Sequence, residues 1–177
     1  HGTNGVNAAL RAGVDSIEHG TFLDAASLEL FKKSGAWYVP TVIAGVSVGE
    51  RAKLPGFYPP AVAEKARQVG PQVQDALRRA QAGGVRIAFG TDAGVFPHGE
   101  NARELGYMVE AGLAPMDALR AATVDSAALL GIESETGTLE VGKQADLIAT
   151  RRNGLVDVSE LSRVIFVMRG GSVYKRE

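Results

Sequence analysis

Residues 85–94 read Val-Arg-Ile-Ala-Phe-Gly-Thr-Asp-Ala-Gly, an apolar run that ends among small residues around one carboxylate, Asp92. The composition of 85–89 predicts a strand, and the small residues around Asp92 leave its side chain accessible. Residues 14–20, Val-Asp-Ser-Ile-Glu-His-Gly, repeat this pattern with His19 at the end of the strand. Because α/β folds place their sites at the C-terminal ends of parallel strands, these two side chains are the first functional candidates.

Segments of helical composition alternate with three strand-like runs before residue 137. Strands are predicted over 14–18, 36–43 and 85–89, and a loop over 44–60. The first two predicted helices run from a cap at Thr3 or Asn4 to Gly13 and from Asp24 to Gly35. The others are predicted over 61–82, kinked or split at Pro71, from a capping box of Asn101 and Glu104 to Ala111, and from Pro115 to Gly131. Such alternation indicates parallel β/α units with both sheet faces covered. Two architectures fit: a small open α/β domain, or part of an eight-stranded barrel of about 250 residues. A chain that begins at His1 without an initiator Met favours the barrel.

The period changes at Gly137. Residues 138–150 and 164–174 are strand-like, with Gly170-Gly171 as a hairpin turn. We therefore expect two parts, an α/β unit over 1–136 and a strand-rich tail over 137–177.

The composition argues against several classes of function and of site. Nineteen basic and twenty acidic residues give a formal net charge of −1, which offers no general grip on nucleic acid or anionic lipid. The absence of cysteine excludes disulfides, a thiolate nucleophile and Cys-ligated metal sites. No apolar run approaches the roughly 20 residues of a membrane span, and the first residues lack the order of a signal peptide, so we expect a cytoplasmic protein without nucleic-acid or membrane partners.

An imidazole and a carboxylate in one site are ordinary ligands of zinc or a similar divalent ion, and the carboxylate can also transfer a proton. Two structural readings remain open on spacing alone: His19 as a ring hydrogen-bonded to a neighbouring loop, and Asp92 as a turn cap. Tyr38 and Thr41, on the second strand, fit either a pocket wall or the core.

Four stretches occur in an order that resembles the C-terminal half of the amidohydrolase superfamily: residues 12–20, 39–41, 90–94 and 137–148. The branch that looks most similar holds imidazolonepropionase-like enzymes and the Xaa-Pro and Xaa-Arg/Lys dipeptidases. The resemblance covers essentially the whole chain. It implies the C-terminal part of a metal-dependent (β/α)8 TIM barrel over 1–136, followed by strands of a small β-sandwich domain.

The resemblance also assigns roles to individual positions. His19 matches the metal-ligating histidine of barrel strand six, and Asp92 matches the strand-eight aspartate that touches metal and acts as general base and acid. His98 matches a loop position near the substrate, although an exposed loop histidine is an equal alternative. His1 aligns with the second histidine of a His-Ala-His-Gly segment, so it is either a neighbour of the metal site or an ordinary residue at the chain end. His1 is also a candidate substrate contact, and so is Tyr38, by its place on the second strand.

The implied activity is metal-dependent hydrolysis of a carbon–nitrogen bond in a dipeptide or another small amide, with one or two zinc ions. The family's remaining ligands, a His-x-His pair and a lysine, belong to a preceding half, and the full-length protein is expected to be a homo-oligomer. Two alternatives stay open: a catalytically inert truncated fragment, and a small α/β binding module in which His19 and Asp92 are structural.

Overall fold

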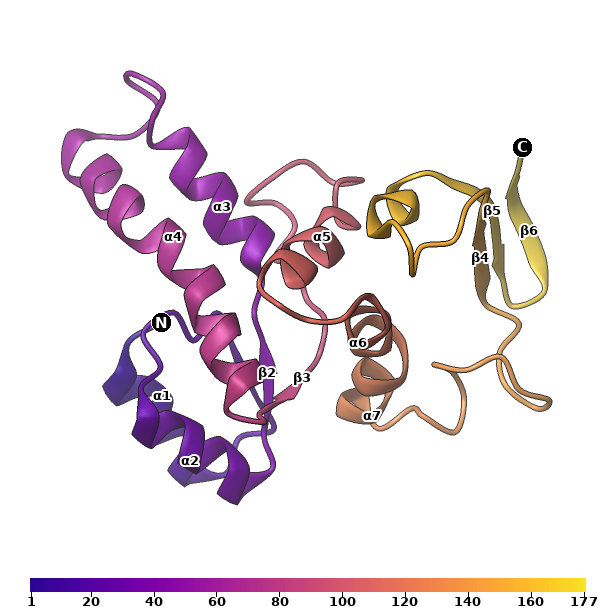
Figure 1. The fold of residues 1–177 in the computed structure, drawn as a ribbon, viewed down its shortest axis with the longest axis horizontal. Coiled ribbons are helices and arrows are strands. Elements are labelled where there is room, and N and C mark those ends of the chain that lie inside the picture. The colour runs from indigo at the N-terminus through magenta and orange to yellow at the C-terminus, as the bar shows by residue number, and fades with distance from the viewer.

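The computed structural model describes all residues from 1 to 177. Its six strands form two three-stranded sheets. The first sheet is parallel in the order β1 (Ser16–Glu18), β2 (Trp37–Val39) and β3 (Arg86–Ile87). The second is antiparallel in the order β4 (Leu147–Thr150), β5 (Val164–Arg169) and β6 (Ser172–Arg176). Figure 1 shows the second sheet at the opposite end of the molecule from α1 and α2.

Helices connect the parallel strands and continue after the last of them. They are α1 (Thr3–Ala12), α2 (Ala25–Ser34), α3 (Val42–Arg51), α4 (Pro60–Ala82), α5 (Arg103–Glu110), α6 (Pro115–Arg120) and α7 (Ser126–Leu130), with a π-helical turn η1 (Ala121–Asp125) and a 3-10 turn η2 (Val158–Ser162). In Figure 1, α3 and α4 run side by side as a long hairpin next to the parallel sheet. None of these helices is long and apolar enough to cross a membrane.

The parallel sheet divides the buried side chains into two clusters, because successive residues of a strand face opposite sides. Tyr38 belongs to the larger cluster, which it shares with α1, α2, α4 and α5. Trp37 and Val39 face the other side with Ala88. There the guanidinium of Arg86 lies 3.7 Å from the Trp37 ring centroid.

Residues 42–51 correct the loop predicted over 44–60, since they form α3 and leave only 52–59 as a connection. Gly45 and Gly49 suggested a loop, but in the structure they are packing residues. A Cβ on Gly70 of α4 would lie 2.9 Å from the Gly45 carbonyl oxygen and 3.0 Å from the Gly49 Cα. Glycine is therefore used here for close approach of two helix backbones, which composition alone does not distinguish from a turn.

Helix ends were predicted with mixed success. Asp24 caps α2 in a capping box with Ser27, and Gly35 and Gly131 end their helices in the left-handed conformation, as expected. The cap predicted for α1 is wrong: Gly2 is the N-cap residue, and Thr3 and Asn4 already belong to the helix.

The strand predicted over 138–150 is shorter, because only Leu147–Thr150 pairs with β5.

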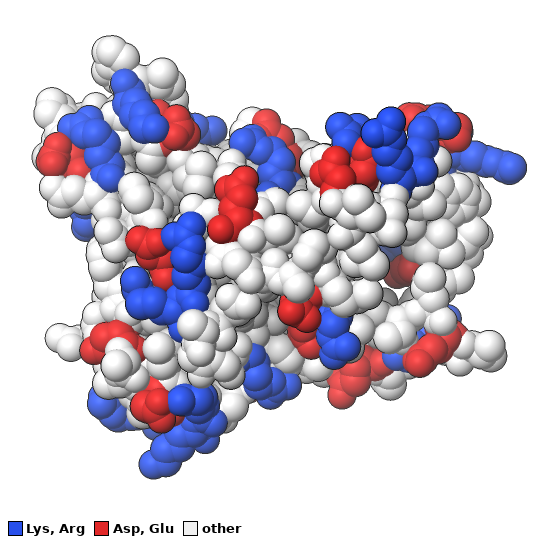
Figure 2. Space-filling view, viewed as in Figure 1, with Lys and Arg blue, Asp and Glu red and all other residues white.

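Positive and negative side chains are interspersed over the face drawn in Figure 2, in keeping with a net charge near zero.

Candidate functional site

Three residues other than glycine have a positive φ, and each follows a different strand of the parallel sheet. They are His19 after β1 (φ 67°), Thr41 after β2 (φ 48°) and Asp92 after β3 (φ 54°). The left-handed region is unfavourable for residues with a Cβ, and such strain gathers at functional sites. The backbone thus marks the same two candidates as the sequence and adds Thr41.

These three residues line one pocket of about 250 Å³ together with His1. The remaining wall is mainly apolar and comes from α3, α4 and the loop after β3; it consists of Ala44, Gly45, Val48, Val69, Gly70, Val73 and Val95. His19 and Asp92 therefore open on the same side of the sheet, at the carboxyl ends of its strands.

Both histidines of the pocket are held through one ring nitrogen. Nδ1 of His19 lies 2.6 Å from the Thr41 hydroxyl, and Nδ1 of His1 lies 2.7 Å from the Thr21 hydroxyl. The two rings stack, with centroids 4.6 Å apart and 10° between their planes. In each ring the nitrogen left for another ligand is Nε2.

Two predicted substrate contacts lie outside this pocket. Tyr38 is fully buried, and its hydroxyl donates to the backbone carbonyl of His19 at 2.8 Å. Burial raises the pKa of the Tyr38 hydroxyl, which stays a proton donor to that carbonyl. The expectation of a pocket-wall tyrosine is thus corrected, because the side chain points into the core and supports the His19 backbone. His98 is exposed in the loop after β3 and is absent from the pocket lining.

Glu104 has another role than the capping box that the sequence predicted for it. It does not complete a capping box at the start of α5, because Oδ1 of Asn101 accepts the Gly99 N–H instead, while the Asn101 amide donates to the Thr91 hydroxyl. Its carboxylate is completely buried and accepts the backbone N–H groups of Val42 at 2.9 Å and Ile43 at 2.7 Å. Burial raises the pKa of Glu104 to about 7.

A signal for this burial was present in the sequence. Glu104 lies one residue before Leu105 and four before Met108, the two apolar residues that α5 buries. A carboxylate on the buried stripe of an amphipathic helix has to find hydrogen-bond donors inside the protein.

The donor set of the pocket fits zinc in part. An imidazole nitrogen of His19 and a carboxylate oxygen of Asp92 are ordinary zinc ligands. However, the structure holds no group of three or more His, Cys, Asp or Glu side chains arranged to bind a metal ion. Catalytic zinc normally has three protein ligands, so this chain supplies at most a part of such a site.

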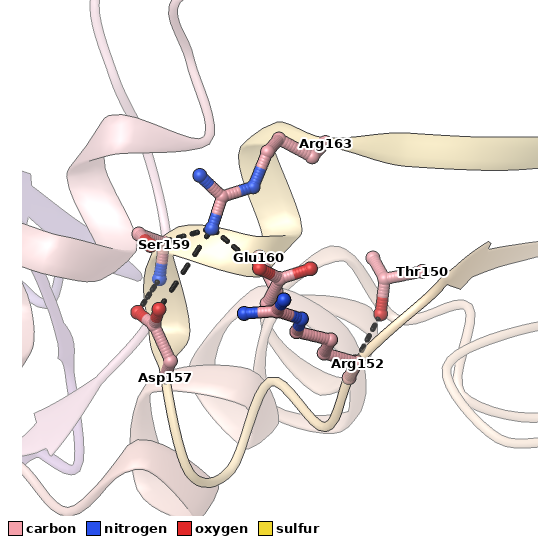
Figure 3. Close-up of polar contacts among 6 residues, drawn as sticks. All are labelled: Thr150, Arg152, Asp157, Ser159, Glu160 and Arg163. Atoms are coloured by element: carbon pink, nitrogen blue, oxygen red, sulfur yellow. Dashed lines mark hydrogen bonds and ion pairs between the residues drawn. The ribbon is translucent and has the colours of Figure 1, made fainter.

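A larger groove of about 860 Å³ lies between the second sheet and the loop before α5. Figure 3 shows that Arg163, one of the residues that line this groove, donates to the Ser159 hydroxyl at 3.2 Å and pairs with Glu160 and, at 3.8 Å, with Asp157. None of the candidates His1, His19, Asp92 and His98 lines this groove.

Comparison with known proteins places the chain in a family. The sequence profile of the Amidohydrolase family matches residues 1–175. Ochratoxinase of Aspergillus niger is 34% identical over 184 residues, which cover 99% of this chain and 37% of ochratoxinase. Imidazolonepropionase of Symbiobacterium thermophilum is 57% identical over 37 residues, 21% of this chain and 9% of that protein.

The fold has a solved counterpart. The crystal structure of an Xaa-Pro dipeptidase with methionine bound in its active site superposes with a TM-score of 0.97 at 48% identity, covering 99% of this chain and 43% of that chain. This chain thus spans less than half the length of ochratoxinase and of the dipeptidase. The resemblance predicted from the sequence motifs is confirmed, and the chain belongs to the amidohydrolase family.

Proposed function

We propose that this chain is the C-terminal part of a metal-dependent (β/α)8 hydrolase that cleaves carbon–nitrogen bonds in dipeptides or other small amides. The observation that carries the proposal is the shared pocket of His19 and Asp92 at the carboxyl ends of parallel strands, within an amidohydrolase chain. The 48% identity with an Xaa-Pro dipeptidase supports dipeptides as the first substrate class to test. In this proposal residues 137–177 contribute strands to a small β-sandwich domain.

Each site residue has a stated role in the proposed reaction. His19 would hold zinc through Nε2, and Asp92 would add a carboxylate oxygen. When bound, the metal would supply Lewis acidity toward the substrate carbonyl and a water molecule. Asp92 accepts the proton of the attacking water and returns it to the leaving nitrogen. His1, which lines the same pocket, would be a neighbour of the metal. His98 stays a candidate substrate contact on the family resemblance alone, since it is exposed in the loop after β3 and lies outside the pocket lining.

A second candidate, a catalytically inert fragment, is favoured by the absence of a three-ligand group in the structure. The upstream gene sequence separates the two. An upstream His-x-His pair, with a His-Ala dipeptide immediately before His1, would support the hydrolase. A start codon shortly before His1 would support the inert fragment.

The decisive experiment measures zinc content and hydrolysis of a dipeptide panel by the polypeptide that includes this upstream sequence. Asp92→Asn is expected to remove most turnover and leave the fold intact, because the side-chain volume is kept and the proton acceptor is lost. His19→Asn is expected to lower zinc content per chain. Asp117→Asn, an exposed position on α6, is the matched control. Near-normal turnover of Asp92→Asn would refute the role given to this residue.

A further inference from the structure

The N-terminus of α3 lies between the pocket and the buried carboxylate of Glu104. Thr41 precedes α3 as its N-cap, a position where threonine ordinarily accepts a backbone N–H of the first turn through its hydroxyl. Here the hydroxyl makes no bond to its own helix. It donates instead to the Pro40 carbonyl at 2.8 Å and lies 2.6 Å from Nδ1 of His19.

Glu104 takes over the capping that Thr41 does not provide. Its two carboxylate oxygens each accept one of the first two N–H groups of α3, from Val42 and Ile43, which would otherwise lack an acceptor. The positive end of the helix dipole favours a negative group at this place. Glu104 forms no ion pair, so these two backbone groups are its stabilising partners in the interior.

We propose that Glu104 is a positioning residue of the pocket, which caps α3 from outside and thereby frees the Thr41 hydroxyl to hold His19. The inference rests on the proposed function, in which His19 binds the metal. It assigns a role to a residue of α5 that lies in the core and touches neither the metal nor the substrate.

The hydroxyl of Thr41 has a single proton, and its geometry gives that proton to the Pro40 carbonyl. Its oxygen is then an acceptor for Nδ1–H of His19. An imidazole that keeps its proton on Nδ1 presents the lone pair of Nε2, the form that a metal ion requires. Because Thr41 has a strained left-handed backbone, its geometry depends on surrounding contacts, and Glu104 supplies them for the two residues that follow.

The test compares Glu104→Gln with Glu110→Gln in the 177-residue chain, because Glu110 is exposed on the same helix α5. The first readout is the pair of ¹⁵N chemical shifts of the His19 ring in the metal-free chain near pH 8.5, which reports the tautomer. The second is zinc affinity by calorimetry.

We expect the Nδ1–H tautomer in the unmodified chain and in Glu110→Gln. In Glu104→Gln we expect a mixture of tautomers and a zinc affinity about 10- to 100-fold lower, the usual effect of losing a group that orients a ligand. Thr41→Val, which removes the hydroxyl, is expected to give the same losses, and Thr41→Ser is expected to restore both readouts. A rescue of this kind separates orientation of His19 from a general loss of stability.

An unchanged His19 tautomer in folded Glu104→Gln overturns the proposal. Should that variant not fold, Glu104→Asp, which keeps the charge on a side chain one methylene shorter, is read in the same way. If neither Glu104 variant folds, an unchanged tautomer in Thr41→Val overturns the proposal, and its loss with rescue by Thr41→Ser supports it. If the tautomer changes while zinc affinity is equal in all variants, the positioning role stands and the metal role of His19 fails.

Discussion

Replacing Gly70 by alanine tests whether the close contact between α3 and α4, which both line the pocket, contributes to stability. The new Cβ would lie 2.9 Å from the carbonyl oxygen of Gly45 and 3.0 Å from the Cα of Gly49, distances that oblige one helix to move. Both contacts are with backbone, so no side-chain rotation relieves them. Overpacking of this kind costs about 1–3 kcal/mol, whereas alanine gains about 1 kcal/mol of helix propensity over glycine. We expect a net loss of about 0–2 kcal/mol in the free energy of unfolding.

Gly106→Ala is the matched control, since Gly106 lies inside α5 and a Cβ there meets nothing within 4 Å. It gains helix propensity without the clash, and it is expected to stabilise the chain by about 0.5–1 kcal/mol. Urea unfolding followed by circular dichroism measures both changes. The reasoning is refuted if Gly70→Ala is as stable as Gly106→Ala, because the two helices would then separate at no cost.

Three further outcomes are expected from the same structure. Ser27→Ala should lower the free energy of unfolding by about 1–3 kcal/mol, because the Ser27 hydroxyl donates to the buried Asn7 Oδ1 at 2.7 Å and alanine leaves that oxygen without its donor; urea unfolding measures it. Burial raises the pKa of Glu104 to about 7 from 4.5, so its contribution to stability is full below pH 4.5 and falls by about 3 kcal/mol as pH rises through 7. The difference in unfolding free energy between the unmodified chain and Glu104→Gln, measured from about pH 4 to 8, should show this slope, and a flat difference would contradict it. Zinc should raise the melting temperature of the 177-residue chain only slightly, since His19 and Asp92 belong to no three-ligand group; a large rise would show a complete site.

The sequence predicted the features that depend on local chemistry. Strands were predicted over 14–18, 36–43 and 85–89, and each is present as a shorter strand, at 16–18, 37–39 and 86–87. The second prediction extended too far, because Val42 and Ile43 already belong to α3. The Asp24 cap of α2 followed from the ordinary chemistry of a helix start. The juxtaposition of His19 and Asp92 in one pocket followed from a general rule, that carboxyl ends of parallel strands meet at one edge.

The errors arose where a residue's partner is distant in the chain. Gly45 and Gly49 have the composition of a loop, and only the approach of Gly70 explains why they lie in a helix. Glu104 stands three residues after Asn101, the spacing of a local cap, yet its donors are 61 and 62 residues away. Local pattern rules cannot separate these cases, because glycine and glutamate each serve a local and a tertiary purpose with the same sequence signature.

The pocket combines two costs that a purely structural element would not keep. Left-handed backbone at His19, Thr41 and Asp92 is strained, and an ionised Glu104 in the core opposes folding at neutral pH. Glycine at His19, Thr41 or Asp92 would remove the backbone strain, and a neutral side chain at Glu104 would remove the cost of burying a charge. Both costs concern residues within or directly behind the same 250 Å³ pocket, while apart from these three residues every positive φ in the chain belongs to glycine. Stability is therefore given up where side-chain orientation matters, which is the pattern expected of a site that has to present an imidazole and a carboxylate in fixed directions.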